Sequence, residues 1–145
     1  MKVFLMFLSF LAIVPTYALA QDEIALFNGH GRASAYIAVD DELTIYLWSG
    51  KPVAYLSSSE NGGYDVYGFN GVHLGWFLKG VIRNHDGDAV CATKERMATT
   101  ESEPFKGFKE FKPFKAFKEF APFRPSFSSV WADEPCSLAL AAGSV

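Results

Sequence analysis

Recognised catalytic motifs are missing from this chain of 145 residues. It has no Gly-x-Ser-x-Gly elbow, no His-Glu-x-x-His zinc motif and no Walker-type phosphate loop. Histidine is scarce too, with 3 copies scattered through the chain, and the aspartates beside His85 are explained as turn chemistry. The densest acidic cluster, Asp40-Asp41-Glu42, is typical of a solvated loop. We therefore expect no enzyme, no cofactor, no metal site and no catalytic residues.

Long apolar runs are also rare. One run over residues 3–14, interrupted only by Ser9, follows the positive start Met1-Lys2, and the small-x-small site Ala18-Leu19-Ala20 precedes Gln21. These three zones in this order are typical of a cleavable secretory signal peptide, because the apolar run is too short to span a bilayer comfortably. An N-terminal membrane anchor is the alternative. We predict a signal peptide over residues 1–20 and a secreted or periplasmic mature chain without a transmembrane segment.

Four segments within residues 22–94 align on a glycine. Each glycine follows an aliphatic residue by five positions, and dipeptides such as Asn70-Gly71 and Asp86-Gly87 favour tight hairpin turns. Val, Ile, Tyr, Trp and Phe dominate the flanks, which argues against helix. The aligned glycines are Gly31, Gly50, Gly71 and Gly87. The pattern predicts an all-β domain of four pseudo-symmetric β-hairpins over residues 22–94.

Two columns of this repeat indicate how the hairpins pack. Four residues after each glycine the residue is small, and the next residue is aromatic in three of the four units. The small residues are Ala35, Ala54, Gly75 and Cys91, and the following ones are Tyr36, Tyr55, Trp76 and Ala92. Small side chains permit close backbone approach near a four-fold axis, with aromatic rings further out. We predict a closed ring, which leaves no long free sheet edge.

The run over residues 26–94 resembles the four-fold beta flower domain family. The resemblance is carried by Gly50-Lys-Pro-Val-Ala-Tyr55, Asn70-Gly-Val-His-Leu-Gly-Trp76 and Ile82-Arg-Asn-His-Asp-Gly87. It implies a bacterial protein with a closed four-hairpin fold, and it implies no activity, since families of this kind are not assigned one. The fourth unit departs from the repeat at Ala92 and Thr93, as a terminal repeat that closes an array often does.

Cysteine occurs only twice, as Cys91 and Cys136. An oxidising compartment permits a disulfide between them, but the sequence does not require one. Because Ala or Gly fills the position of Cys91 in the other three units, we interpret Cys91 as a small buried residue that happens to carry a thiol.

Residues 95–145 form a low-complexity Pro/Phe/Lys tail with a nine-residue period divided into threes. Phe recurs at every third position from Phe105 to Phe123, and Lys follows it from Lys106 to Lys118. Period three matches a polyproline II helix, which would place the Phe side chains along one edge, whereas Pro113 and Pro122 would interrupt an α-helix. We predict a largely disordered tail that samples this conformation, with short helices formed on an apolar surface as the alternative.

Two functions fit these features. The first is a non-enzymatic secreted or periplasmic module whose β domain is a scaffold and whose basic aromatic tail contacts an anionic envelope surface or a protein partner. The second is a ligand-binding module in which the aromatic hairpins bind a sugar or a cell-wall fragment. Nucleic acid is not an expected partner, because the compartment argues against it. The candidate binding residues are Tyr36, Tyr55, Trp76, Phe105, Phe108, Phe111, Phe114, Phe117 and Phe120.

Overall fold

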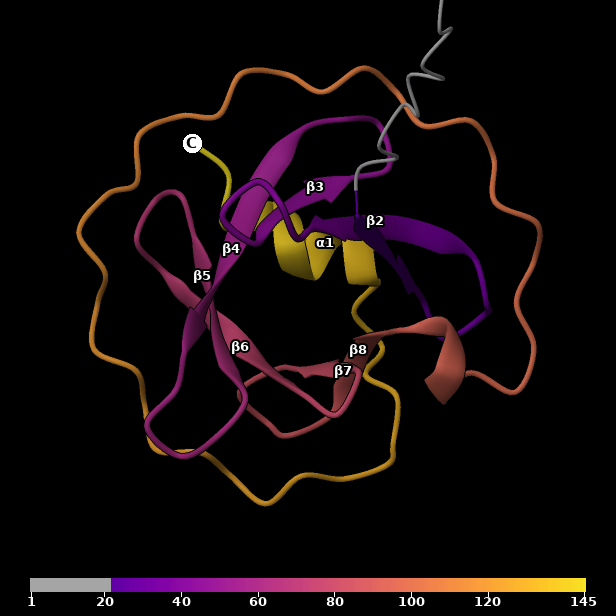
Figure 1. Cartoon of the computed structure of the whole chain (residues 1–145). Helices are drawn as coiled ribbons and strands as arrows, with labels where there is room; N and C mark the ends of the chain where they lie inside the picture. The colour runs from indigo at the N-terminus through magenta and orange to yellow at the C-terminus, as the bar shows by residue number, and fades with distance from the viewer. Residues whose placement is uncertain (1–21) are drawn as a thin grey trace, which may run out of the picture.

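The computed structural model describes residues 22–145, so the predicted signal peptide lies outside the described residues. Eight antiparallel strands pair in chain order, and the last strand pairs with the first to close a barrel (Figure 1). The strands are β1 (Glu23–Phe27), β2 (Ala33–Ala38), β3 (Thr44–Leu47), β4 (Pro52–Ser58), β5 (Tyr64–Gly68), β6 (His73–Leu78), β7 (Val81–Arg83) and β8 (Ala89–Ala92). The predicted all-β closed ring is therefore confirmed.

The four aligned glycines lie in the turns of four equivalent hairpins, β1–β2, β3–β4, β5–β6 and β7–β8. Their φ angles are 78°, 99°, 87° and 86°, a left-handed region that only glycine occupies at low cost. Each hairpin also has a register shift just before its turn, which increases the local twist. The predicted strand–turn–strand unit is thus repeated four times in the fold.

The column of small residues faces the interior of the barrel. Each small residue pairs across its hairpin with the aliphatic residue that precedes the turn glycine by five positions. The pairs are Leu26 with Ala35, Ile45 with Ala54, Val66 with Gly75 and Ile82 with Cys91. All of them except Gly75 belong to one buried hydrophobic cluster. Close packing at the centre explains why this column holds only small side chains.

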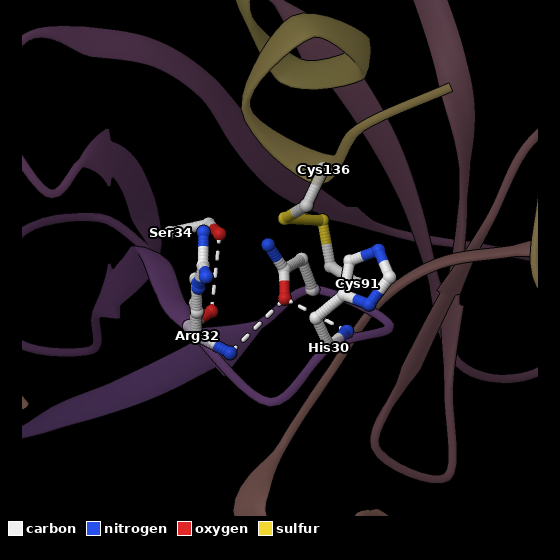
Figure 2. The surroundings of a disulfide bond; sticks show 6 residues. His30, Arg32, Ser34, Cys91 and Cys136 are labelled. Atoms are coloured by element: carbon white, nitrogen blue, oxygen red, sulfur yellow. Dashed lines mark hydrogen bonds between the residues drawn. A yellow bond between two sulfur atoms is a disulfide. The ribbon is translucent and has the colours of Figure 1, made fainter. Parts of the chain in front are cut away.

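A short helix, α1 (Cys136–Ala141), completes this core. Its Cys136 and Leu140 are each 1 % exposed and belong to the same cluster as the strand residues. Cys136 forms a disulfide with Cys91 of β8, whose Cα atom is 5.1 Å away (Figure 2). The interpretation of Cys91 as an incidental thiol is therefore wrong, although its burial is as predicted. The bridge forms because the chain returns to the barrel interior beside the small-residue column.

Between β8 and α1 lie a single 3₁₀ turn, η1 (Lys94–Arg96), and a long segment without helix or strand, residues 98–130, which we call the strap. The strap runs around the outside of the barrel (Figure 1). The tail thus lacks regular secondary structure over most of its length, as predicted. It differs from a largely disordered tail because the strap is hydrogen-bonded to the barrel and residues 136–141 form α1. In residues 22–145 no helix has the length and apolarity needed to cross a membrane.

Candidate functional site

The strap is bonded to the barrel at the four turn glycines. Backbone N–H groups of the strap donate to the carbonyl oxygens of these glycines at 2.8–3.0 Å. The donor–acceptor pairs are Glu101 with Gly31, Glu110 with Gly50, Glu119 with Gly71 and Ser128 with Gly87. Successive donors are nine residues apart, so one nine-residue repeat of the strap spans one hairpin of the barrel. Pro113 and Pro122 are separated from these donors by multiples of three residues, so they occupy positions of the same kind. Because proline has no N–H group, neither position needs an acceptor on the barrel.

The same four glycines leave room for the strap backbone. A Cβ atom added at any of them would overlap a strap carbonyl oxygen. The carbonyls belong to Thr99 at Gly31, Phe108 at Gly50, Phe117 at Gly71 and Ser126 at Gly87. These residues are also nine apart. Glycine is therefore required at each turn both for its positive φ and for contact with the strap.

The lysines of the strap point inward and pair with carboxylates of the barrel. Lys106 and Lys109 lie 2.7 and 2.8 Å from the carboxylate of Glu23, and Lys112 lies 2.7 Å from that of Asp41. Burial raises the pKa of the Glu23 carboxyl, but hydrogen bonds from the two lysines outweigh it and leave the pKa below its usual value. The positive charge of the strap is therefore largely neutralised within the molecule.

These ammonium groups also lie over the tyrosines on the outside of the barrel. Lys106 is 4.7 Å from the ring centroid of Tyr36, and Lys115 is 4.3 Å from that of Tyr55. Cation–π attraction favours this placement. Burial, with the charges of Glu23 and Asp41, raises the pKa of Tyr36 to about 12.

The aromatic hairpin residues predicted to bind a ligand are covered. Tyr36, Tyr55 and Trp76 are 1, 4 and 2 % exposed, beneath or beside the strap. A crevice of about 400 Å³ remains between strap and barrel, lined in part by Tyr55, Lys115 and Lys118. The structure thus brings these three aromatic residues together with the tail, and it does not place their faces in solvent.

At the fourth hairpin the barrel supplies the cation and the strap supplies the aromatic ring, the reverse of the second and third hairpins. Lys109 and Lys118 of the strap lie 5.4 and 5.2 Å from the ring centroids of Tyr46 and Tyr67. Nine residues further along, the strap carries Phe127, and Arg83 of the barrel lies 4.8 Å from its centroid. The same attraction is therefore kept with its partners reversed.

Sequence reasoning missed a contact near this hairpin between a buried histidine, His73, and an exposed one, His85. His73 is fully buried; its Nε2 atom lies 3.0 Å from Asp65 Oδ1, and its Nδ1 atom lies 2.9 Å from His85 Nε2. Burial lowers the pKa of His73 and outweighs the raising effect of Asp65. No sequence signal links the two histidines, because they come from different hairpins. Among residues 22–145 no group of three or more His, Cys, Asp or Glu side chains is placed to hold a metal ion.

Seven of the eight phenylalanines of the strap point away from the barrel, all except Phe127. These seven are 98–104 % exposed, and they form what we call the phenylalanine row: Phe105, Phe108, Phe111, Phe114, Phe117, Phe120 and Phe123. The lysines face inward and the phenylalanines face outward, each at every third residue. A polyproline II helix, with three residues per turn, places side chains in this way. All six tail residues predicted to make contacts lie in this row, which Phe123 extends.

A family model described as 4-fold beta flower protein matches residues 24–140. The match includes all of the barrel strands except Glu23, the whole strap and most of α1. No curated protein and no solved structure matches the chain.

Proposed function

Because the chain belongs to the 4-fold beta flower family, a family of unknown function, we propose that it is a non-enzymatic scaffold that displays the phenylalanine row for contact with a protein or an envelope surface. The barrel supplies a rigid support, and the strap supplies the contact residues. We further propose that the protein works outside the cytoplasm.

The exposure of the row is the observation that carries this proposal. Seven phenylalanines are almost wholly in solvent. At roughly 150–250 Å² each, such rings together present roughly 1,000–1,700 Å², whereas the largest apolar patch of a typical monomer is roughly 300–600 Å². A patch of this size favours burial against a partner. Because the strap is already fixed on the barrel, little further backbone entropy is lost on contact.

The distribution of charge supports contact with an apolar surface more than contact with an anionic surface. Lys106, Lys109 and Lys112 face carboxylates of the barrel, and the chain as a whole has a formal net charge of −3. Electrostatic attraction to an anionic envelope therefore receives less support than the basic tail suggested. The alternative of a sugar site at Tyr36, Tyr55 and Trp76 also receives less support, since binding to these faces would first require the strap to move.

Substitution within the row tests the contact. A photo-crosslinking residue at position 114, introduced in the native host, is expected to yield a crosslinked product at the row. In the same chain, Phe111→Ser with Phe117→Ser should remove that product, because the flanking apolar contacts are lost, whereas the Phe→Leu pair should retain it. Absence of any crosslink, or a product insensitive to both serines, contradicts the proposal.

The proposed location has a separate test. A buried disulfide between Cys91 and Cys136 supports an oxidising compartment. Mass spectrometry of the exported protein is expected to find Gln21 at the N-terminus and both cysteines oxidised. A chain that keeps residues 1–20, or stays in the cytoplasm, would be evidence against export.

A further inference from the structure

We propose that the phenylalanine row binds the phenylalanine row of a second copy of this chain, with the rings of the two rows interdigitated. This inference rests on the contact function proposed above and names the partner. It concerns the mature, oxidised protein with the strap in place.

The spacing of the row suits a second row of the same kind. Successive phenylalanines are three residues apart, and a polyproline II helix rises about 3.1 Å per residue, so the Cα atoms of neighbouring phenylalanines stand about 9.3 Å apart along the strap. The strap is convex, so the rings diverge outward and are spaced somewhat more widely than their Cα atoms. A ring from another row, placed midway, lies roughly 5–6 Å from each neighbour, within the roughly 4.5–7 Å range of aromatic pairs. Each gap therefore accepts one ring and fills well.

The row is also compatible with two-fold symmetry. Its spacing is the same in both chain directions, so two antiparallel rows present the same pattern to each other, as an isologous contact requires. The four strap lysines from Lys106 to Lys115 have side chains only 25–38 % exposed, and each is paired with a carboxylate of its own barrel. Like-charge repulsion between two straps is thereby reduced.

The curvature of the strap limits how much of the row one partner can cover. Nine residues span one of the four hairpins, so the strap follows a circle of about 18 Å radius if it rises about 3.1 Å per residue. Two convex arcs of this size meet over about two or three rings each, or roughly 600 Å² per copy, below the roughly 800 Å² of a stable interface. One contact is therefore weak, and the remaining rings are free for further copies.

A lipid surface fits these features less well. A flat bilayer also touches only two or three rings of a convex row, and it gains nothing from their regular spacing. The lysines that would attract anionic lipids are paired within the molecule. We therefore expect copies of this chain to associate reversibly into small clusters through several weak contacts.

Sedimentation velocity over a wide range of protein concentration tests this. The wild-type protein is expected to show a sedimentation coefficient that rises with concentration, and Phe111→Ser/Phe114→Ser/Phe117→Ser is expected to stay at the monomer value. The matched control is Val130→Ser/Leu138→Ser, which replaces exposed apolar residues outside the row and should associate like the wild type. The serine variant should fold normally, because the three phenylalanines that it replaces are 99–103 % exposed, and near-ultraviolet circular dichroism checks this.

A crosslinker at position 114 identifies the contact itself. Mapping the crosslinked peptides of the purified protein is expected to place both partners within residues 105–123. A wild-type protein that stays monomeric, or crosslinks that map to the barrel, overturns the inference. Monomers that instead bind zwitterionic phospholipid vesicles through the row also overturn it, while the broader contact function would survive.

Discussion

At the scale of single residues, the strap is held by many weak contacts. A cation–π contact contributes about 0.5–2 kcal/mol depending on solvation, and an exposed ion pair contributes about 0–1 kcal/mol. Lys115 makes the shortest cation–π contact of the strap lysines, 4.3 Å to the centroid of Tyr55. No single contact holds the strap in place. Its path around the barrel depends on many similar contacts, repeated from hairpin to hairpin.

Replacing Lys115 by Met should therefore weaken the strap without unfolding the barrel. We expect a decrease of about 0.5–2 kcal/mol in the free energy of unfolding, measured with urea, because the ammonium over the buried Tyr55 is lost. Lys51→Met, at an exposed turn position, serves as the control and should change stability little. Equal effects of the two substitutions would contradict the role given to Lys115.

His73 should make the protein sensitive to acid. Because burial lowers its pKa in the folded state below the ordinary 6.5, the unfolded chain binds the proton more readily. The contribution of neutral His73 to the free energy of unfolding is thus fully present above about pH 6.5. It is lost as the pH falls through the lower pKa of His73 in the folded state. The charged or titratable groups that face it are Asp65, His85 and Glu119.

Thermal unfolding at pH values above and below 6.5 measures this acid sensitivity. The Tm of the wild type should fall on mild acidification, and His73→Gln should reduce that fall, since the amide can still donate to Asp65 but does not titrate. His30→Gln, at an exposed turn, should leave the fall unchanged. If both variants have the pH profile of the wild type, His73 is not responsible.

At the scale of elements, the barrel was largely predictable and the strap was not. Both periods are visible in the sequence, four glycine-centred units and a nine-residue tail repeat. Their relation is hidden because the glycines are unevenly spaced along the chain, by 19, 21 and 16 residues, while the strap reaches one after another in equal steps of nine residues. The equal length of the tail repeats reflects the distance between neighbouring turns in the folded ring. It does not reflect the number of residues between the glycines in the sequence.

Two further features of the strap run against sequence intuition. Phe is expected inside and Lys outside, but the barrel presents carboxylates and tyrosine faces, which favour ammonium groups. The disulfide was equally out of reach, because Cys136 meets Cys91 only after the strap has passed all four turns. Local patterns carry strand and turn preferences, whereas these contacts depend on where the whole tail runs.

The register of the strap can be tested by inserting one alanine after Pro113. Every later residue would then be out of phase, so the N–H groups of Glu119 and Ser128 should lose their glycine acceptors. Hydrogen exchange is expected to show faster exchange at these two amides. The amides of Glu101 and Glu110, which precede the insertion, are internal controls and should remain protected. Uniform protection along the strap would show that register does not matter.

At the scale of the whole molecule, the disulfide closes a covalent loop around the barrel. The loop leaves the barrel at Cys91, follows the four turns and returns at Cys136, a separation of 45 residues. Closing a loop of this length restricts the unfolded chain and stabilises the folded one by about 4 kcal/mol. The bridge also holds α1 in the core, where Leu140 is 1 % exposed. The strap is thus anchored at both ends.

The double variant Cys91→Ala/Cys136→Ala should therefore lower the free energy of unfolding by about 4 kcal/mol, because the unfolded chain regains the freedom of the loop. Alanine suits both buried positions, so packing losses should be small. Urea unfolding of the oxidised wild type, the reduced wild type and the variant separates the two effects, since the last two should agree within the packing difference. Hydrogen exchange of the variant should show strap amides less protected, while the amides of β1 to β6 remain protected. If the reduced wild type unfolds at the same urea concentration as the oxidised protein, the strap is held by its own contacts and the bridge adds nothing.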